Sequence, residues 1–151
     1  MKIDDRFHGI STLVSSSTAL GQSQGTGFFY QQLGEREKAA QPGYAWRQVT
    51  QTWLVTNRHV VLPRAGDQEL VPDSFTFNLR RRVEDRIEWD PIVLSRGQLL
   101  ERARFHTDRE VDVAIVSVQD LIVRKLGFNV GIVWYGYLVD EIIASDQKYA
   151  P

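Results

Sequence analysis

Cysteine is absent from this 151-residue chain, and its absence excludes disulfide bonds and thiolate metal sites. The absence fits a reducing compartment without proving one, because extracellular bacterial proteins can also lack cysteine. Residues 1–9 are rich in charged side chains and contain no apolar stretch of the kind that a signal peptide needs. We therefore expect a cytoplasmic protein.

Long apolar runs are also missing, and none approaches the roughly 20 residues that a membrane-spanning helix needs. Neither sign of charge predominates, because 18 Lys and Arg stand against 19 Asp and Glu, for a formal net charge of −1. Such a balance provides no overall electrostatic attraction to nucleic acid or to anionic lipid. The sequence thus predicts neither a membrane nor a nucleic acid as a partner.

The composition is typical of a globular domain. Hydrophobic residues make up 42% of the chain and charged residues 25%, which is close to the average of soluble proteins. A chain of this length forms about one domain around one core, and we find no internal repeat or low-complexity segment. We therefore treat residues 1–151 as one folded unit.

Several segments have the pattern of β-strands. Apolar and polar side chains alternate with period two over Phe75–Arg80, which predicts a strand with one buried face. Aromatic and β-branched residues predict further strands over Trp46–Val55 and Val111–Val118. Ile87–Leu94 is expected to be a strand at an edge or a bulge, because Pro91 cannot donate to a ladder.

Glycine, proline and polar residues separate these strands. Gly21–Gly27 and Gly34–Gly43 predict loops, the first of which leads into a strand. Arg58–Val61 predicts a single helical turn, capped by a side-chain oxygen of Thr56 or of Asn57.

The remaining segments are less regular. Leu121–Leu126 and Asp140–Lys148 are compatible with helices, and Phe128–Val139 is rich in aromatic and β-branched residues. Gln98–Arg104 is ambiguous. Short strands separated by turn signals predict a mainly β fold, either a barrel or a sandwich, with short helical segments.

Three segments contain motifs in a distinctive order. Gly25-Thr26-Gly27-Phe28 comes first, Thr56-Asn57-Arg58-His59-Val60 follows, and Val111-Asp112-Val113-Ala114 comes last. Together they resemble the first half of bacterial trypsin-like serine peptidases of the chymotrypsin fold, including the HtrA-type group. In that family, Gly-x-Gly-Phe, Thr-Asn-x-His-Val and Asp-hydrophobic-Ala segments recur. The resemblance covers about residues 21–118 and implies that residues 1–151 form an incomplete N-terminal Greek-key β-barrel of a double-barrel domain.

The resemblance implies catalytic roles for His59 and Asp112. His59 would act as the general base that takes the proton of a serine hydroxyl, and it would later protonate the leaving amine. Asp112 would accept a hydrogen bond from the other ring N–H, fixing the tautomer and stabilising the imidazolium. The implied substrate is a peptide or protein, and no metal or organic cofactor takes part.

Other acids near Asp112 leave alternatives open. Asp108 or Glu110 could be the partner of the histidine, although Asp112 directly precedes the Val-Ala pair of the motif. If their segment is extended, His106, Asp108 and Glu110 share one face with possible metal-ligand spacing, but a solvated loop explains the same residues.

Two further features also have structural explanations. Gly25 and Gly27 fit a turn or a bulge better than direct contact with substrate. Arg80–Arg82 suggests a phosphate-binding patch and thus a third hypothesis, an Arg-rich nucleic-acid binder. Glu84 and Asp85 follow closely, however, so a solvated strand edge is the usual explanation.

The family places its nucleophile in a Gly-x-Ser-Gly-like segment after the acid, and this sequence contains no such segment. Ser117 and Ser145 are the only serines after Asp112, and neither has a neighbouring glycine. We therefore expect a fragment or truncation that lacks the second barrel and is inactive by itself. Apolar surface that the missing half would cover could drive self-association. The alternative is a nonenzymatic β-domain that kept the peptidase fold as a binding or regulatory module.

Overall fold

The computed structural model describes residues 11–36, 47–83 and 86–126, which form a mainly β structure with short helices. The strands of the large sheet are β1 (Ser11–Thr18), β2 (Gly21–Arg36), β3 (Arg47–Thr56), β6 (Ser74–Val83), β7 (Arg86–Ser95), β8 (Ala103–Phe105) and β9 (Ala114–Ser117). The other elements are the hairpin of β4 (Arg64–Ala65) and β5 (Gln68–Glu69), and the helices α2 (Arg58–Val61), α3 (Arg96–Arg102) and α4 (Gln119–Leu126).

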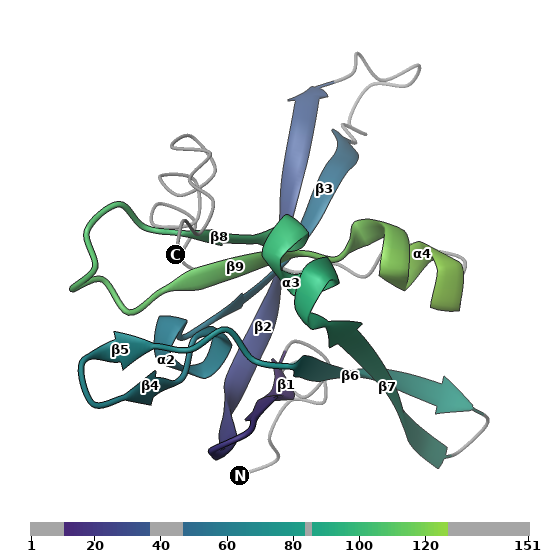
Figure 1. The fold of residues 1–151 in the computed structure, drawn as a ribbon. Coiled ribbons are helices and arrows are strands. Elements are labelled where there is room, and N and C mark those ends of the chain that lie inside the picture. Colours follow the sequence, from purple (N-terminus) through teal and green to yellow (C-terminus); the bar gives the residue numbers. More distant parts are fainter. Residues whose placement is uncertain (1–10, 37–46, 84–85, 127–151) are drawn as a thin grey trace, which may run out of the picture.

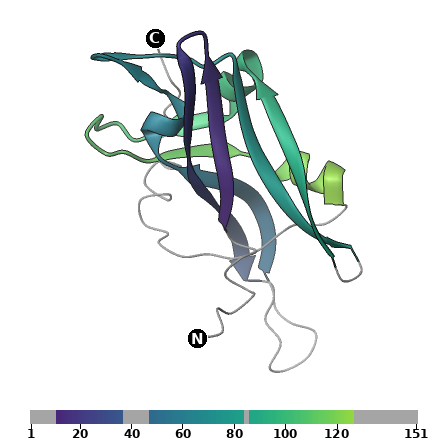
Figure 2. The same cartoon turned by 90° about the horizontal axis from the view of Figure 1, so that it is seen from below.

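The seven strands of the large sheet lie in the order β7-β6-β1-β2-β3-β9-β8, and all neighbours are antiparallel. No closed barrel is detected within the described ranges. Because β6 returns to lie beside β1, the order β6-β1-β2-β3 is that of a Greek key. The connection from β3 to β6 contains α2 and the β4–β5 hairpin, which lie close together in Figure 1. Figure 2 shows β1 and β2 between β3 and the β6–β7 pair.

Alternate residues of the strands point into one main core. Val14 of β1 lies opposite Phe77 of β6, and Phe29 of β2 lies opposite Leu54 of β3, so these side chains share the inner face. The helices contribute further buried side chains to this core: Val60, Val61, Leu99 and Ile122. Burying a large apolar side chain stabilises a fold by about 1.5–3 kcal/mol, so this core holds the helices on the sheet.

The outer face of β2, β3 and β9 is apolar as well. Tyr30, Trp53, Val55 and Ile115 form a second buried cluster there. Their strand neighbours point the other way into the main core, so this part of the sheet is apolar on both faces. Burial on both faces explains why these strands are continuous apolar runs in the sequence rather than alternating ones.

Two predictions about glycine-containing segments are wrong, wholly or in part. Gly21–Gly27, expected to be a loop, belongs to β2 and pairs with β1 without a register shift. The turn lies instead at Ala19–Leu20, followed by Gly21 with a φ of 137°, a backbone conformation that favours glycine. In the predicted loop Gly34–Gly43, residues 34–36 also belong to β2, and the others lie outside the described residues.

The predictions of strands elsewhere agree better with the structure. Strands are present as expected over most of Trp46–Val55, Phe75–Arg80 and Ile87–Leu94, as β3, β6 and β7. As expected, β7 is an edge strand of the sheet. In the described sheet no strand pairs with its outer side, so the missing N–H of Pro91 interrupts no ladder there. The strand predicted over Val111–Val118 is too long, since β9 begins only at Ala114.

The predicted helices at Arg58–Val61 and Leu121–Leu126 are confirmed as α2 and α4. The ambiguous segment Gln98–Arg104 contains the end of α3 and the start of β8, and a capping box between Ser95 and Gln98 begins α3. Phe128–Val139 and Asp140–Lys148 lie outside the described residues. In the part of the chain that the structure describes, no helix is long and apolar enough to cross a bilayer.

Candidate active site

His59 lies on α2, a single helical turn that follows β3 almost directly. Arg58, Val60 and Val61 are buried on this turn, whereas the side chain of His59 is 55% exposed. The backbone N–H groups of Val60 and Val61 both donate to the carbonyl oxygen of Asn57 and close the turn. The buried neighbours therefore hold α2 in place while the imidazole remains accessible to solvent.

Two residues of neighbouring strands hold Val60 against the sheet. The hydroxyl of Ser16 in β1 donates a hydrogen bond to the carbonyl oxygen of Val60. Gly25 in β2 lies so close that a Cβ there would come within 2.6 Å of Val60 Cγ2, and a Cβ on Gly27 would come within 2.8 Å of Leu54 Cδ1. The prediction that these glycines serve a turn or bulge is wrong, because both are regularly paired strand positions, where a Cβ would force the neighbouring side chain to shift.

Asp112 meets His59 because their two strands are neighbours. Thr56, the last residue of β3, pairs with Ala114, the first residue of β9, so the residues just beyond them lie at the same edge of the sheet. Asp112 Oδ1 accepts a hydrogen bond from the backbone N–H of His59 at 2.9 Å, and Oδ2 lies 2.6 Å from the ring Nδ1. Asp112 belongs to the loop between β8 and β9, although it falls within the strand predicted over Val111–Val118. Its carboxylate is therefore positioned by hydrogen bonds to other side chains and backbone groups, and its backbone does not pair in the sheet.

The alternative acids do not take this place. Asp108 Oδ1 accepts a hydrogen bond from the backbone N–H of Glu110, and the Asp108 N–H donates to His106 Nδ1. These bonds form a turn, so the extended arrangement that would give metal-ligand spacing is absent here. Among the described residues, no group of three or more His, Cys, Asp and Glu side chains could hold a metal ion. The solvated-loop interpretation fits the exposed side chains of Asp108 and Glu110.

Asn57 has a role that sequence reasoning missed. It occupies the N-cap position of α2, but its side chain makes no capping hydrogen bond. Its Nδ2 donates instead to Asp112, to Oδ2 at 3.2 Å and to the backbone oxygen at 3.4 Å. The hydroxyl of Thr56, the other predicted cap, donates to the carbonyl oxygen of Thr26 at 3.0 Å. The prediction that a side chain of Thr56 or Asn57 caps α2 is therefore wrong, and the Asn57 side chain instead helps to hold Asp112 in place.

The ionised form of Asp112 is favoured by its neighbours. Burial raises the pKa of this carboxyl, but the hydrogen bonds from the His59 backbone and ring, the charge of His59 and the Asn57 amide outweigh burial. The pKa of Asp112 therefore lies below its ordinary value of 3.8. An ionised carboxylate only accepts hydrogen bonds, so we infer that Nδ1 of His59 carries a proton. In the neutral form of the ring, Nε2 then presents a lone pair.

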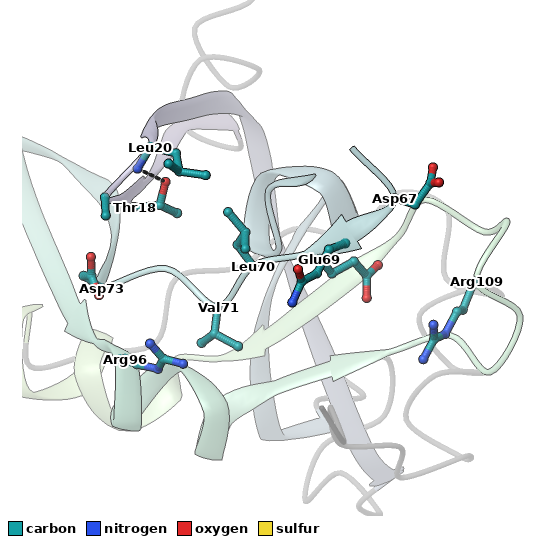
Figure 3. A pocket seen from close by; sticks show the side chains of 11 residues that line it. Thr18, Leu20, Asp67, Glu69, Leu70, Val71, Asp73, Arg96 and Arg109 are labelled. Atoms are coloured by element: carbon teal, nitrogen blue, oxygen red, sulfur yellow. Dashed lines mark hydrogen bonds between the residues drawn. The ribbon is translucent and has the colours of Figure 1, made fainter. Parts of the chain in front are cut away.

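A groove adjoins His59. One hollow of about 400 Å³ is lined by His59 together with Ser23 and Arg64, and a second of about 560 Å³ extends beyond it. Both hollows share three lining residues: Thr18, Leu20 and Leu70. Figure 3 shows the larger hollow, surrounded by side chains from the β1–β2 turn, the β4–β5 hairpin and the start of α3. An extended ligand passing His59 would therefore find a surface to lie on.

Sequence reasoning also missed Arg58 and Glu69, which form an ion pair beside the larger hollow, where Glu69 is a lining residue. Arg58 Nε lies 2.6 Å from Glu69 Oε1, and the hydrogen bond from Arg58 holds the pKa of Glu69 below its ordinary value of 4.5, although burial opposes this shift. No sequence pattern joins them, since one belongs to an apolar stretch and the other to a polar hairpin. For Arg80–Arg82, only the side chain of Arg80 lies within the described part, so the solvated strand edge expected there stays a prediction and the phosphate-binding patch a hypothesis.

No hydroxyl group of the described residues hydrogen-bonds to the ring of His59. The hydroxyl of Ser23 donates to the backbone oxygen of His59 at 3.5 Å. Ser117 lies in β9, where its hydroxyl accepts a hydrogen bond from Gln51. Ser145 lies outside the described residues. The histidine and the acid are thus assembled without a nucleophile in this part of the chain.

Comparison with protein-family models, curated proteins and solved structures gave no match to this chain.

Proposed function

We propose that this chain is the N-terminal part of a trypsin-like serine peptidase domain, in which His59 is the general base and Asp112 orients it. The complete domain hydrolyses peptide bonds through an acyl-enzyme and needs no metal or organic cofactor. The observation that carries this proposal is the 2.6 Å contact between His59 Nδ1 and Asp112 Oδ2.

The exposure of the two side chains favours a chemical role over a structural one. His59 is 55% exposed and Asp112 46% exposed, and an ion pair at such exposure contributes only about 0–1 kcal/mol to stability. Stabilisation of the loop between β8 and β9 therefore does not explain why His59 and Asp112 are paired. The acid meets Nδ1, which leaves Nε2 for a reacting partner, as general base catalysis requires.

Each group then has a defined task. Nε2 of His59 takes the proton of a serine hydroxyl while the serine oxygen attacks the scissile carbonyl. Asp112 stabilises the imidazolium that forms. The same proton passes to the leaving amine. The serine and the donors of an oxyanion hole have to come from outside the described residues.

The strand order supports the finer fold proposal, a Greek-key barrel that is the first of two. The Greek-key order β6-β1-β2-β3 and the neighbouring β3 and β9 bring the histidine and the acid to one edge of the sheet. The proposed cleavage site lies at that edge, where a second barrel would complete it.

A nonenzymatic binding module is the second candidate. It is favoured by one observation: no hydroxyl of the described residues reaches the His59 ring. In that case the groove beside His59 would bind a protein segment without cleaving it, and the histidine and the acid would be retained without a nucleophile.

The gene sequence beyond codon 151 separates the two candidates. A Gly-x-Ser-Gly segment favours the peptidase, and the complete protein should then react with a fluorophosphonate probe and cleave peptides. His59→Ala should abolish both reactions, and Asp112→Asn should lower the rate by about 10⁴-fold. The 151-residue chain alone should not turn over peptides, because its sequence contains no Gly-x-Ser-Gly-like segment. Peptide cleavage that survives His59→Ala would contradict the proposal, and a natural stop codon after Pro151 would favour the binding module.

A further inference from the structure

Arg58, the residue before His59, is a buried cation. The side chains of Arg58 and Glu69 are only 7% and 9% exposed. They meet at two points, Nε to Oε1 at 2.6 Å and Nη2 to Oε2 at 3.0 Å. Bidentate pairing fixes orientation as well as distance. Because desolvation offsets most of the attraction in a buried pair, stability alone does not account for its presence.

The guanidinium of Arg58 also contacts the segment that carries Asp112. Its Cζ lies 5.0 Å from the centre of the Phe105 ring in β8, within the range of a cation–π contact. Its Nη1 donates to the backbone oxygen of His106, at the start of the loop, at 3.5 Å. Near the end of this loop, Asn57 donates to the backbone oxygen of Asp112 at 3.4 Å. Two adjacent residues thus hold both ends of the loop.

Glu69 extends this connection to the groove. It belongs to β5 and lines the larger hollow, where Figure 3 shows it near Leu70. Three short segments therefore meet at the guanidinium of Arg58: α2, the β4–β5 hairpin and the loop between β8 and β9. A helix of one turn is not stable by itself, so the position of α2 depends on such tertiary contacts.

We propose that the Arg58–Glu69 pair is the positioning element of this site, holding His59 in register with Asp112 and tying both to the wall of the groove. Neither residue touches the reacting atoms, and both act through their neighbours. The catalytic meaning of this inference rests on the proposed function, but the geometry that it predicts can be measured in the chain as it is.

Native-state hydrogen exchange, followed by NMR, tests the proposal on the 151-residue protein. The readout is the exchange rate of the His59 backbone amide, which donates to Asp112, relative to the slowest amides of β6. Glu69→Gln should accelerate exchange at His59 by about the same factor as at β6, because the opening of α2 loses the same ion pair that global unfolding loses. A pair that does not hold α2 would instead accelerate exchange only at β6 and leave His59 unchanged, because the pair would stay intact when α2 opens.

Two further variants keep the test decisive. Arg58→Met/Glu69→Leu replaces both partners with apolar groups of similar size and should remain folded even where Glu69→Gln does not. In this variant the exchange rates at His59 and at β6 should again change by the same factor. The matched control is Asp120→Asn, which breaks another bidentate pair, Arg102 Nη1 to Asp120 Oδ1 at 2.6 Å and Nη2 to Oδ2 at 2.9 Å. In this control, exchange at β6 should accelerate and exchange at His59 should not, because Arg102 and Asp120 stay paired when α2 opens.

The outcomes separate this inference from the proposed function. If Glu69→Gln accelerates exchange at β6 and leaves the His59 amide unchanged, the positioning role is wrong, whether or not the complete protein cleaves peptides. If exchange at His59 rises with that at β6 in Glu69→Gln but not in Asp120→Asn, the positioning role is supported, even where a complete protein proves inactive.

Discussion

Asp112 holds His59 at two points, the backbone N–H through Oδ1 at 2.9 Å and the ring Nδ1 through Oδ2 at 2.6 Å. One carboxylate therefore controls both where the start of α2 lies and how the imidazole is turned. A change at Asp112 should affect the backbone and the ring together.

Asp112→Asn should reverse the tautomer of His59. The amide oxygen can still accept from the His59 N–H, but the NH₂ group then faces Nδ1, so Nδ1 becomes an acceptor and the proton moves to Nε2. The ¹⁵N chemical shifts of the ring report which nitrogen carries the proton. Asp108→Asn, in the same loop, is the control and should leave the ring unchanged. An unchanged tautomer in Asp112→Asn would contradict the assigned orientation.

Gly25→Ala should destabilise the protein by about 1–3 kcal/mol, because the new Cβ would lie 2.6 Å from Val60 Cγ2 and force a shift. Gly97→Ala in α3 is the matched control: nothing lies within 4 Å of its Cβ position, and helix propensity should add about 0.5–1 kcal/mol of stability. Urea unfolding measures both. Equal effects of the two substitutions would show that Val60 does not restrict Gly25.

Val60→Ala should partly relieve the Gly25→Ala variant. Removing the Val60 methyl groups leaves a cavity, yet it also removes the atom that the new Cβ meets. In a double-mutant cycle the two substitutions should therefore couple by about 0.5–3 kcal/mol in the favourable direction. Strict additivity of the unfolding free energies would argue against direct contact.

Glu69→Gln should change how stability depends on pH. The folded-state pKa of Glu69 lies below 4.5, so its stabilising effect is complete above that pH and is lost as the pH falls through the lower, folded value. At neutral pH the substitution should cost about 3–5 kcal/mol, because it leaves Arg58 buried without its anion. The difference from the unaltered protein should shrink in acid. Denaturant unfolding between neutral and acid pH measures it, and a constant difference would contradict the prediction.

Ser16→Ala should destabilise the protein by about 1–3 kcal/mol, because the buried carbonyl oxygen of Val60 loses the Ser16 hydroxyl as donor. Ser15→Ala, the next residue on the opposite face of β1, should stay within about 0.5 kcal/mol of the unaltered protein. Thermal unfolding of the two variants under one condition provides the comparison.

Local patterns predicted the strands well where one face of the strand is buried. The alternation in Phe75–Arg80 marks β6 because side chains in a strand point to opposite faces in turn. Glycine misled this reasoning at Gly21–Gly27, where the residue type indicates a turn. The actual requirement for glycine at Gly25 comes from Val60, 35 positions later, and no local window contains such a contact.

The candidate site could be predicted only in part. His59 and Asp112 stand in motifs whose residue types are restricted by chemistry, so their proximity was foreseeable from the resemblance. Asn57 and Arg58 lie within the same motif, but their partners are decided by how the chain folds back. Arg58 and Glu69 pair because the β4–β5 hairpin returns to α2, and this return follows from tertiary packing rather than from sequence spacing.

The cluster of Tyr30, Trp53, Val55 and Ile115 is buried, so the outer face of β2, β3 and β9 is not a solvent-facing surface. A version of the protein shortened for expression must therefore keep this face covered. A version in which these aromatic rings became exposed to water should aggregate and accumulate in inclusion bodies.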